Sequence, residues 1–232
     1  MSRAVKTVDD CLAACPLFAG LSGERLEEAL RFFDAREKSY KKGAALVRQG
    51  DAIPAFGLVL EGMVRVCCHD MQGNRVIMAT VGPGGTFAES LSYLKVTASP
   101  IDAEAVGDSR VLWLTTARLH GSVRGGGGCD CQMSDRFTAM LAQRTLSMND
   151  RIQVLSKRSL REKLMTYFSQ HVRLRGSLAF EIDMDRSDLA DYLGTDRSAL
   201  SRELSRMQRD GLIRYSKNRF EIIRAELLEE EL

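Results

Sequence analysis

The stretch that decides the fold of this chain runs from position 185 to position 213 and reads Asp185-Arg-Ser-Asp-Leu-Ala-Asp-Tyr-Leu-Gly-Thr-Asp-Arg-Ser-Ala-Leu-Ser-Arg-Glu-Leu-Ser-Arg-Met-Gln-Arg-Asp-Gly-Leu-Ile213. Asp185 predicts the N-cap of a first helix, and Gly194 predicts its end, because a tight turn between helices favours a residue that tolerates positive φ. Thr195 or Asp196 is expected to cap a second helix. Its apolar residues recur at helical spacing and predict one buried stripe, formed by Leu200, Leu204 and Met207.

The opposite face of the second helix is polar and basic. Small hydroxyls between guanidinium groups suit a helix that enters a major groove, where arginine reaches guanine edges or phosphates. Two short strands follow, at positions 212–215 and 219–223, and flank the basic tip Ser216-Lys217-Asn218. The order of cap, glycine turn, basic helix and hairpin predicts a winged helix-turn-helix that binds double-stranded DNA. The residues predicted to contact DNA are Arg197, Ser198, Ser201, Arg202, Ser205, Arg206 and Lys217.

The quoted stretch resembles the helix-turn-helix of the Crp/Fnr transcription regulators, and the likeness extends over most of the chain. Glycine-punctuated segments match the effector domain of that family: Lys42-Gly43, Gln49-Gly50-Asp51, Leu60-Glu61-Gly62, Gly73-Asn74-Arg75 and Gly82-Pro-Gly-Gly-Thr-Phe-Ala-Glu89. The resemblance implies a transcription regulator with a cyclic-nucleotide-binding-like sensor domain. It also implies a homodimer on an inverted-repeat operator, with RNA polymerase as a further candidate partner.

The resemblance assigns base reading to Arg197, Ser198, Ser201 and Arg202. The Ser201-Arg202 pair matches the usual one, whereas many relatives have Glu at the position of Ser198. Because that Glu accepts a hydrogen bond from cytosine, its absence puts the usual half-site preference in doubt.

Ahead of this unit, the pattern changes along the chain. A short helix is expected at 22–33, with Ser22 as a possible N-cap residue, and a helix at 160–172 with a strand at 180–182. Between positions 41 and 114, short apolar runs alternate with glycines, which predicts an antiparallel β-roll or jelly roll and an α+β chain overall. The expected strands are 45–47, 56–60, 63–66, 76–79 and 111–113.

A long amphipathic helix is predicted between the two parts. Its near-heptad stripe is formed by Met133, Phe137, Met140, Leu141, Thr145, Met148, Ile152 and Leu155. Such a stripe either packs on its own domain or forms a dimer seam, and the seam is favoured because the helix links two domains. We therefore expect an effector domain at 1–128, a dimerisation helix at 129–158 and a DNA-binding domain at 159–232.

In the cyclic-nucleotide binders of the family, a Phe-Gly-Glu turn precedes an Arg-Ser or Arg-Thr pair, and that Arg holds the cyclic phosphate. This chain has Ala88 in place of the Gly and Ala98-Ser99 in place of the pair. Without the Arg, a phosphate lacks its counter-charge, which argues against cyclic AMP. The predicted effector-binding residues are Phe87, Ala88, Glu89, Ser90 and Ser99, for another small molecule; ordinary polar residues of a barrel turn are the alternative.

Cysteines and histidines leave redox, metal and haem sensing open. The family's iron-sulfur members use four cysteines, three of them close together near the N-terminus, whereas only Cys11 and Cys15 lie there. Cys129 and Cys131 are candidate metal ligands, although a one-residue spacing is unlike zinc sites. Cys67 and His69 share one face of a strand, where buried or edge residues are the more ordinary interpretation. His69, His120 and His171 are candidate haem ligands.

Composition narrows the class of protein. The net charge is +2, yet residues 156–224 hold 15 Lys and Arg against 10 Asp and Glu, so the basic excess lies on the predicted DNA-binding part. No apolar run is long enough for a membrane span, and we expect a cytoplasmic protein without a disulfide scaffold. No nucleophile-elbow, phosphate-loop or metalloprotease motif is present, which argues against an enzyme. A sensor or scaffold that uses its winged helix for protein contacts is the alternative function.

Overall fold

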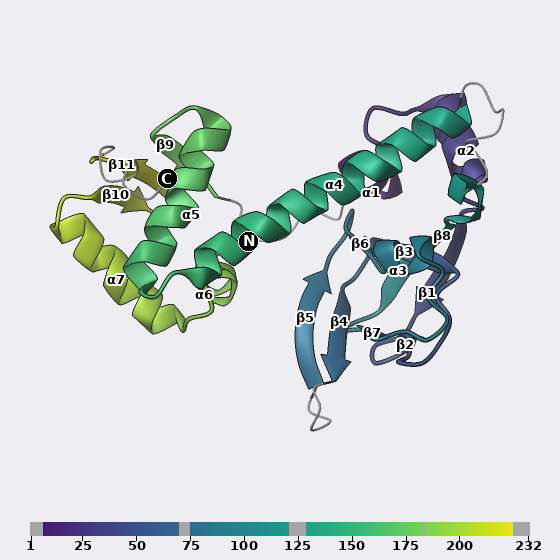
Figure 1. Ribbon diagram of the computed structural model, residues 1–232, viewed down its shortest axis with the longest axis horizontal. Helices are drawn as coiled ribbons and strands as arrows, with labels where there is room; N and C mark the ends of the chain where they lie inside the picture. Colours follow the sequence, from purple (N-terminus) through teal and green to yellow (C-terminus); the bar gives the residue numbers. More distant parts are fainter. Residues whose placement is uncertain (1–6, 70–74, 121–128, 183, 225–232) are drawn as a thin grey trace. The chain divides into compact units, whose positions relative to one another are not determined.

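The chain folds into two compact units, residues 1–142 and 143–232. The computed structural model describes residues 7–69, 75–120, 129–182 and 184–224 (Figure 1). Within these ranges, none of the helices combines the length and apolar character needed to cross a membrane.

The N-terminal unit is a β-roll of two four-stranded antiparallel sheets with short helices. Its helices are α1 (Val8–Ala14), α2 (Gly23–Phe32), α3 (Glu89–Tyr93) and the 3-10 helix η1 (Ala117–His120). One sheet has the order β1-β8-β3-β6 and the other the order β2-β7-β4-β5. The strands are β1 (Arg36–Tyr40), β2 (Ala45–Val47), β3 (Ala55–Glu61), β4 (Val64–His69), β5 (Arg75–Val81), β6 (Thr86–Phe87), β7 (Asp102–Ala105) and β8 (Ser109–Thr115).

Strand alternation divides the apolar residues of this unit between two cores. Val111 on β8 packs in the interior of the roll with Val64 and Ala103 from the opposite sheet. Its neighbours Leu112 and Leu114 point the other way, into a core formed with the N-terminal helices. This period of two is the geometry of a pleated strand, and it buries both faces of β8.

A long helix, α4 (Cys129–Ser156), runs from the first unit into the second. The first part of its predicted stripe, Met133, Phe137 and Met140, is buried in the core of the N-terminal unit. The later part is exposed, with 59% of Met148 and 60% of Ile152 accessible to solvent. Of the two interpretations of the stripe, packing within its own domain therefore applies to the first half only.

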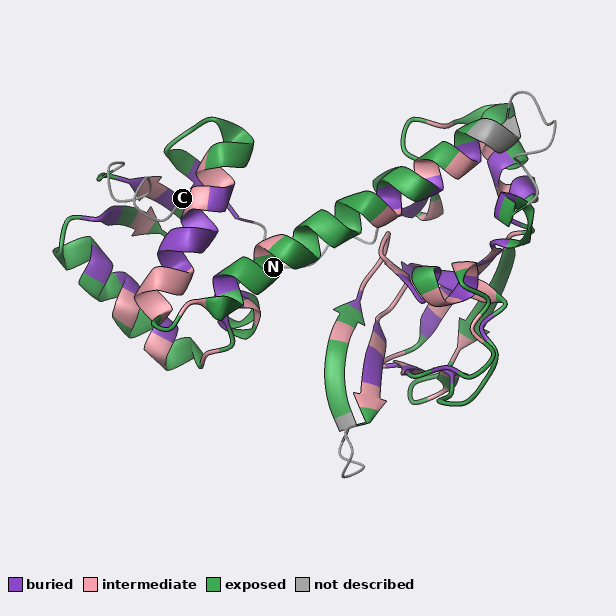
Figure 2. Cartoon of the chain, viewed as in Figure 1, coloured by how far each residue is buried: buried purple, intermediate pink, exposed green. Residues whose placement is uncertain are grey.

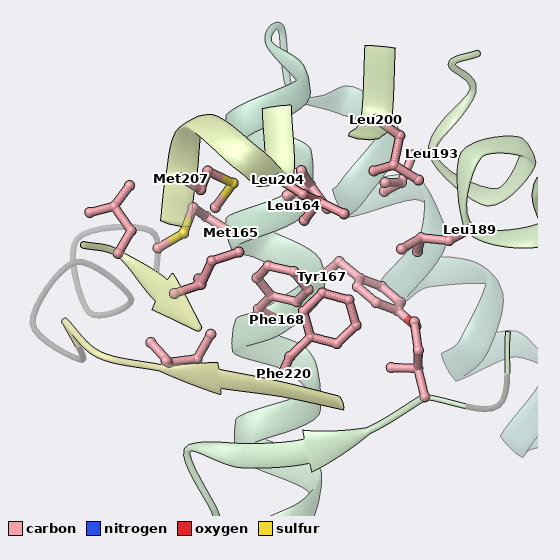
Figure 3. Packing of buried hydrophobic residues seen from close by; sticks show 14 of the residues in the cluster. Leu164, Met165, Tyr167, Phe168, Leu189, Leu193, Leu200, Leu204, Met207 and Phe220 are labelled. Atoms are coloured by element: carbon pink, nitrogen blue, oxygen red, sulfur yellow. The ribbon is translucent and has the colours of Figure 1, made fainter. Parts of the chain in front are cut away.

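The C-terminal unit is a helical cluster beside a three-stranded antiparallel sheet of order β10-β11-β9. Its aromatic core, with Tyr167, Phe168 and Phe220 at the centre, is shown in Figure 3, and Val154 of α4 belongs to the same core. The elements are α5 (Leu160–Arg175), β9 (Ala179–Glu181), α6 (Arg186–Leu193), α7 (Arg197–Arg209), β10 (Ile213–Ser216) and β11 (Arg219–Ile222).

The α+β class, the antiparallel roll and the C-terminal helix-turn-helix are confirmed, while several local details differ from the sequence prediction. Helix α1 and strands β1, β6 and β7 were not expected. β1 reads Arg-Glu-Lys-Ser-Tyr and is largely exposed, so it lacks the apolar signal of a strand. Ser22 precedes α2 but forms no side-chain cap hydrogen bond.

Candidate nucleic-acid interface and candidate sensor region

Two aspartates begin the two helices of the DNA-binding motif. The Asp185 carboxylate accepts hydrogen bonds from the backbone N–H of Ser187 at 2.7 Å and of Asp188 at 2.9 Å. Asp196, rather than Thr195, caps α7 by accepting from the N–H of residue 199 at 2.8 Å. These bonds satisfy N–H groups that the first turn of a helix leaves without a partner.

Gly194 sets the turn between α6 and α7. Its φ of 64° lies in the left-handed region, which a residue with a Cβ enters only at a cost. The predicted glycine end of the first helix is therefore confirmed, and the second helix starts three residues later, at Arg197.

Helix α7 has a buried stripe and a polar face, as Figure 2 shows by its alternating colours. Leu200, Leu204 and Met207 are completely buried against the rest of the unit. The six predicted DNA-contacting residues of this helix all lie on its exposed surface: Arg197, Ser198, Ser201, Arg202, Ser205 and Arg206.

The serine hydroxyls on this face donate hydrogen bonds to acceptors within the same protein chain. Ser201 donates to the carbonyl of Arg197 at 2.9 Å, and Ser205 donates to the carbonyl of Ser201 at 2.9 Å. Ser198 donates to the Asp196 carboxylate at 2.6 Å. The Ser205 hydroxyl also lies 3.4 Å from that of Tyr215. The remaining lone pairs of Ser198 and Ser201 can accept a hydrogen bond, and the donors in a major groove are the amino groups of cytosine and adenine.

The arginines of α7 differ in their surroundings. Arg206 lies 3.6 Å from the Glu203 carboxylate, whereas Arg197 and Arg202 form no ion pair within the described part of the chain. The pKa of Asp196 is lowered first by the hydrogen bond from Ser198 and then by the backbone bond from Ala199, with a smaller contribution from the Arg202 charge. Among the arginines of α7 predicted to contact DNA, Arg197 and Arg202 are thus the most available to bases or phosphates.

An arginine of α5, Arg161, forms two ion pairs with residues of α7 and its C-cap, and we call this arrangement the clamp. The Arg161 guanidinium lies 2.6 Å from the Glu203 carboxylate and 2.8 Å from that of Asp210, the C-cap residue of α7. Glu203 is largely buried, with 13% of its side chain exposed. One planar fork therefore contacts α7 at two points seven residues apart, which resists rotation of the helix about its axis. Sequence reasoning missed this clamp, because no local pattern pairs residues so distant along the chain.

The wing is the hairpin formed by β10 and β11. Its turn consists of Lys217, at φ 51°, and Asn218, and Lys217 is exposed at the tip as predicted. Arg186, at the start of α6, donates to the Lys217 carbonyl at 2.7 Å and lies over the rings of Tyr215 and Phe220 at 5.1 and 5.2 Å. Arg186 therefore ties the wing to the helix-turn-helix.

The predicted effector-binding residues lie in and around the β6–α3 turn. Phe87 and Ala88 are buried in the roll core, and Ala88 occupies the left-handed region at φ 66°, where the resemblance expects glycine. Glu89 is buried and accepts a hydrogen bond from the Thr86 hydroxyl, while Ser90 is exposed. Ser99 is buried, and its hydroxyl donates to the Ile101 carbonyl at 2.7 Å and accepts from the Ile101 N–H at 3.1 Å.

The N-terminal cysteines are packed as core residues. Cys11 and Cys15 are completely buried, and the Cys11 thiol donates to the Leu60 carbonyl at 3.2 Å. Burial raises the pKa of Cys15 to about 11, which keeps it a thiol at neutral pH.

The pairing of β4 with β5 shifts register between Val66 and Cys67, and the extra residue lies on β5, between Ile77 and Ala79. Cys67 is buried, whereas His69 is partly exposed and lies 3.2 Å from the Asp102 carboxylate. The side chains of the candidate metal ligands Cys129 and Cys131 lie outside the described part of the structure.

The three histidines lie in different surroundings. His120 stacks on Tyr93, with ring centroids 4.7 Å apart. His171 contacts Tyr167 through its Nδ1, 3.0 Å from the carbonyl, and burial lowers its pKa. Among the described residues, the structure shows no cluster of three metal-ligating side chains.

Comparison with known proteins covers both units. Residues 37–121 match the model of the cyclic nucleotide-binding domain, and residues 162–231 match that of the Crp-like helix-turn-helix domain. The Cyclic AMP receptor protein of Thermus thermophilus is 29% identical over 215 residues, which cover 93% of this chain and 95% of that protein. The transcriptional activator protein Anr of Pseudomonas aeruginosa is 26% identical over 77% of this chain and 72% of its own length.

A solved structure of a regulatory protein from Silicibacter pomeroyi has the same fold. It superposes with a TM-score of 0.52 at 19% identity, covering 95% of each chain. The order of the two matched domains agrees with the order of roll, long helix and winged helix-turn-helix in this structure. The chain belongs to the Crp/Fnr family of DNA-binding transcription regulators.

Proposed function

We propose that two copies of this chain bind an inverted-repeat operator, with α7 of each copy in a major groove and the wing tip at the adjacent backbone. The single observation that carries this proposal is the division of α7 into a fully buried stripe and an exposed face of arginines and serines. On this face, Arg197 and Arg202 contact base edges or phosphates, and Ser198 and Ser201 accept hydrogen bonds from bases. Ser205, Arg206 and Lys217 contact the backbone.

The second half of α4 supplies the dimer seam. Met148, Ile152 and Leu155 recur at spacings of four and three and are exposed, whereas Val154 turns inward to its own core. An exposed apolar stripe at near-heptad spacing on a helix is stabilised when the same stripe of a second copy covers it.

The control signal is a small molecule that binds in the roll, and it is not cyclic AMP. One relative is named a Cyclic AMP receptor protein, but here Ala98 is exposed without a charge, and the Ser99 hydroxyl is engaged with Ile101. Cys11 and Cys15 are buried, and Cys15 is held as a neutral thiol, which makes these cysteines poor sites of oxidation. As control signals, a bound effector is therefore favoured over oxidation at these two positions. Isothermal titration with cyclic AMP should give no heat of binding, and micromolar affinity would contradict this part of the proposal.

The decisive experiment selects operator sequences from a randomised DNA pool with the full-length protein and then tests Arg202→Ala in a gel-shift assay. We expect loss of specific binding, because a base contact by arginine contributes about 1–3 kcal/mol of discrimination at each half-site. Arg25→Ala removes the same charge from an exposed position on α2 and serves as the matched control.

Two results would count against the proposal. One is full specificity in Arg202→Ala. The other is failure of the wild type to enrich any sequence or to bind DNA in a salt-dependent manner, which would favour a winged helix used for protein contacts.

A further inference from the structure

A cavity at the open edge of the roll is not part of the effector region described above. It has a volume of about 490 Å³ and lies between β1, the end of β8 and the segments around β2 and positions 51–55. Volumes of roughly 300–1,000 Å³ are typical of small-molecule sites. None of the five predicted effector-binding residues lines it.

The cavity has an apolar floor and an aromatic wall. Val47 and Ile53 are buried beneath it, and Tyr40 and Trp113 are half-buried at its side. A flat apolar molecule would remove these groups from water, which is the main source of affinity in such sites.

Two polar groups of the cavity, on Tyr40 and Lys38, are hydrogen-bond donors. The Trp113 indole N–H donates to the Tyr40 hydroxyl at 2.9 Å, so the oxygen of Tyr40 is an acceptor here. The hydrogen of Tyr40 has no acceptor within the described residues and is available to a ligand. The Lys38 ammonium lies 5.1 Å from the centre of the Tyr40 ring. It forms no ion pair with any residue that the structure describes.

Most of the other charges at the rim are already engaged. Arg36 pairs with Asp34 at 2.9 Å, and Glu37 pairs with Arg110 at 3.3 Å. Asp51 accepts a hydrogen bond from the N–H of Arg48 at 3.2 Å. The donors that remain available are therefore a phenol hydrogen and an ammonium group, and both require an acceptor, ideally an anionic one.

We propose that this cavity binds a small aromatic carboxylate, whose ring packs against Trp113 and Ile53 and whose carboxylate is held by Tyr40 and Lys38. This site would give the regulator an effector of a class other than cyclic nucleotides, and in that respect it deepens the proposed function.

The cavity is connected to the β6–α3 turn. The ring of Trp113 contacts that of Phe87 edge-on, with centroids 5.6 Å apart. The cavity segment also bonds to the chain after α3, through the Ile53 N–H to the Val96 carbonyl at 3.0 Å and the Ser99 N–H to the Asp51 carbonyl at 2.8 Å. A ligand that shifts Trp113 or this segment therefore acts on the turn that contains Ala88 and Glu89.

Trp113 is the single tryptophan of the sequence and so reports on the site directly. Phenylacetate is the probe, and it is titrated into the full-length protein without DNA while the tryptophan emission is recorded. We expect a saturable change with phenylacetate and binding at least tenfold weaker with 2-phenylethanol, its neutral analogue, and with 2-phenylethylamine, its cationic analogue. Because DNA is absent, this result does not depend on whether the operator proposal holds.

Lys38→Gln should weaken phenylacetate binding about tenfold, and Tyr40→Phe should weaken it less. Lys42→Gln, which removes a cation outside the cavity lining, should leave the titration unchanged. Circular dichroism of each variant establishes that the roll is folded. The proposal is wrong if phenylacetate gives no saturable signal, if the alcohol or the amine binds as well as the acid, or if folded Lys38→Gln binds like the wild type.

Discussion

Asp185 and Asp196 perform the same task at the starts of α6 and α7, and both depend on being ionised. The pKa of Asp185 is lowered by hydrogen bonds from the N–H groups of Asp188 and Ser187. A carboxyl with a lowered pKa in the folded state stabilises the fold at pH values above its unfolded pKa. That contribution disappears as the pH falls through the folded pKa.

We expect the winged unit to lose stability below about pH 4, the ordinary range of an aspartate. Asn also caps helices but does not titrate there, so the double variant Asp185→Asn, Asp196→Asn should melt near the wild-type temperature at pH 7 and lose less on acidification. Thermal melts by circular dichroism from pH 7 to pH 3 measure both effects. An identical pH dependence in the two proteins would show that other carboxyls dominate.

We expect Ser198 to influence a different property, the choice of DNA sequence. Its hydroxyl is bound to Asp196 and can offer only an acceptor to a base. Ser198→Glu should shift the selected half-site toward cytosine at the base that it contacts, because a carboxylate accepts strongly from the cytosine amino group. Selection from a pool randomised over the half-site reads out the change, and unchanged selected sequences would remove Ser198 from the set of base readers.

At the scale of elements, the orientation of α7 depends on its attachment to α5. Arg161→Met would leave the largely buried Glu203 with Arg206, at 3.6 Å, as its cationic partner. Burying the Glu203 carboxylate without its main cationic partner costs free energy, so α7 should rotate or loosen to expose this group. We expect affinity for the operator to fall about tenfold, with a smaller loss for non-specific DNA.

Two further variants distinguish positioning from general loss of folding. Arg161→Lys keeps the charge but loses the fork that spans Glu203 and Asp210, so it should be intermediate. Arg158→Met removes an exposed cation just ahead of α5 and should behave like the wild type. Equal losses on operator and non-specific DNA would assign Arg161 a purely structural role.

At the scale of the whole molecule, we expect the stripe on α4 to decide the oligomeric state. Ile152→Glu places a charge in the middle of the proposed seam, where burial of an unpaired carboxylate would be costly. Because Ile152 is 60% exposed in a single copy, the fold of that copy should survive the change. We expect a monomer by size-exclusion chromatography with light scattering at micromolar concentration, together with weaker operator binding. Asn149→Glu adds the same charge outside the stripe as a control, and a dimeric Ile152→Glu would place the seam elsewhere.

The sequence by itself determined the features that depend on neighbours along the chain. Spacing of a few residues predicts the cap at Asp185, a cap at Thr195 or Asp196, the glycine turn at Gly194 and the stripe of α7. The structure has all four and places the second cap at Asp196. The antiparallel roll was likewise predictable from its apolar runs and glycine turns. The exposed strand β1 was not, because it carries no such pattern.

Only the tertiary structure decided the features that join distant segments. It divided the stripe of α4 into a buried half at Met133 and an exposed half at Ile152, although both halves have the same spacing in the sequence. It also brought Arg161 to Glu203, and Trp113 to Tyr40, across 42 and 73 positions of chain. Hydrophobic periodicity states which face of an element is apolar, but which other element covers that face depends on packing over the whole chain.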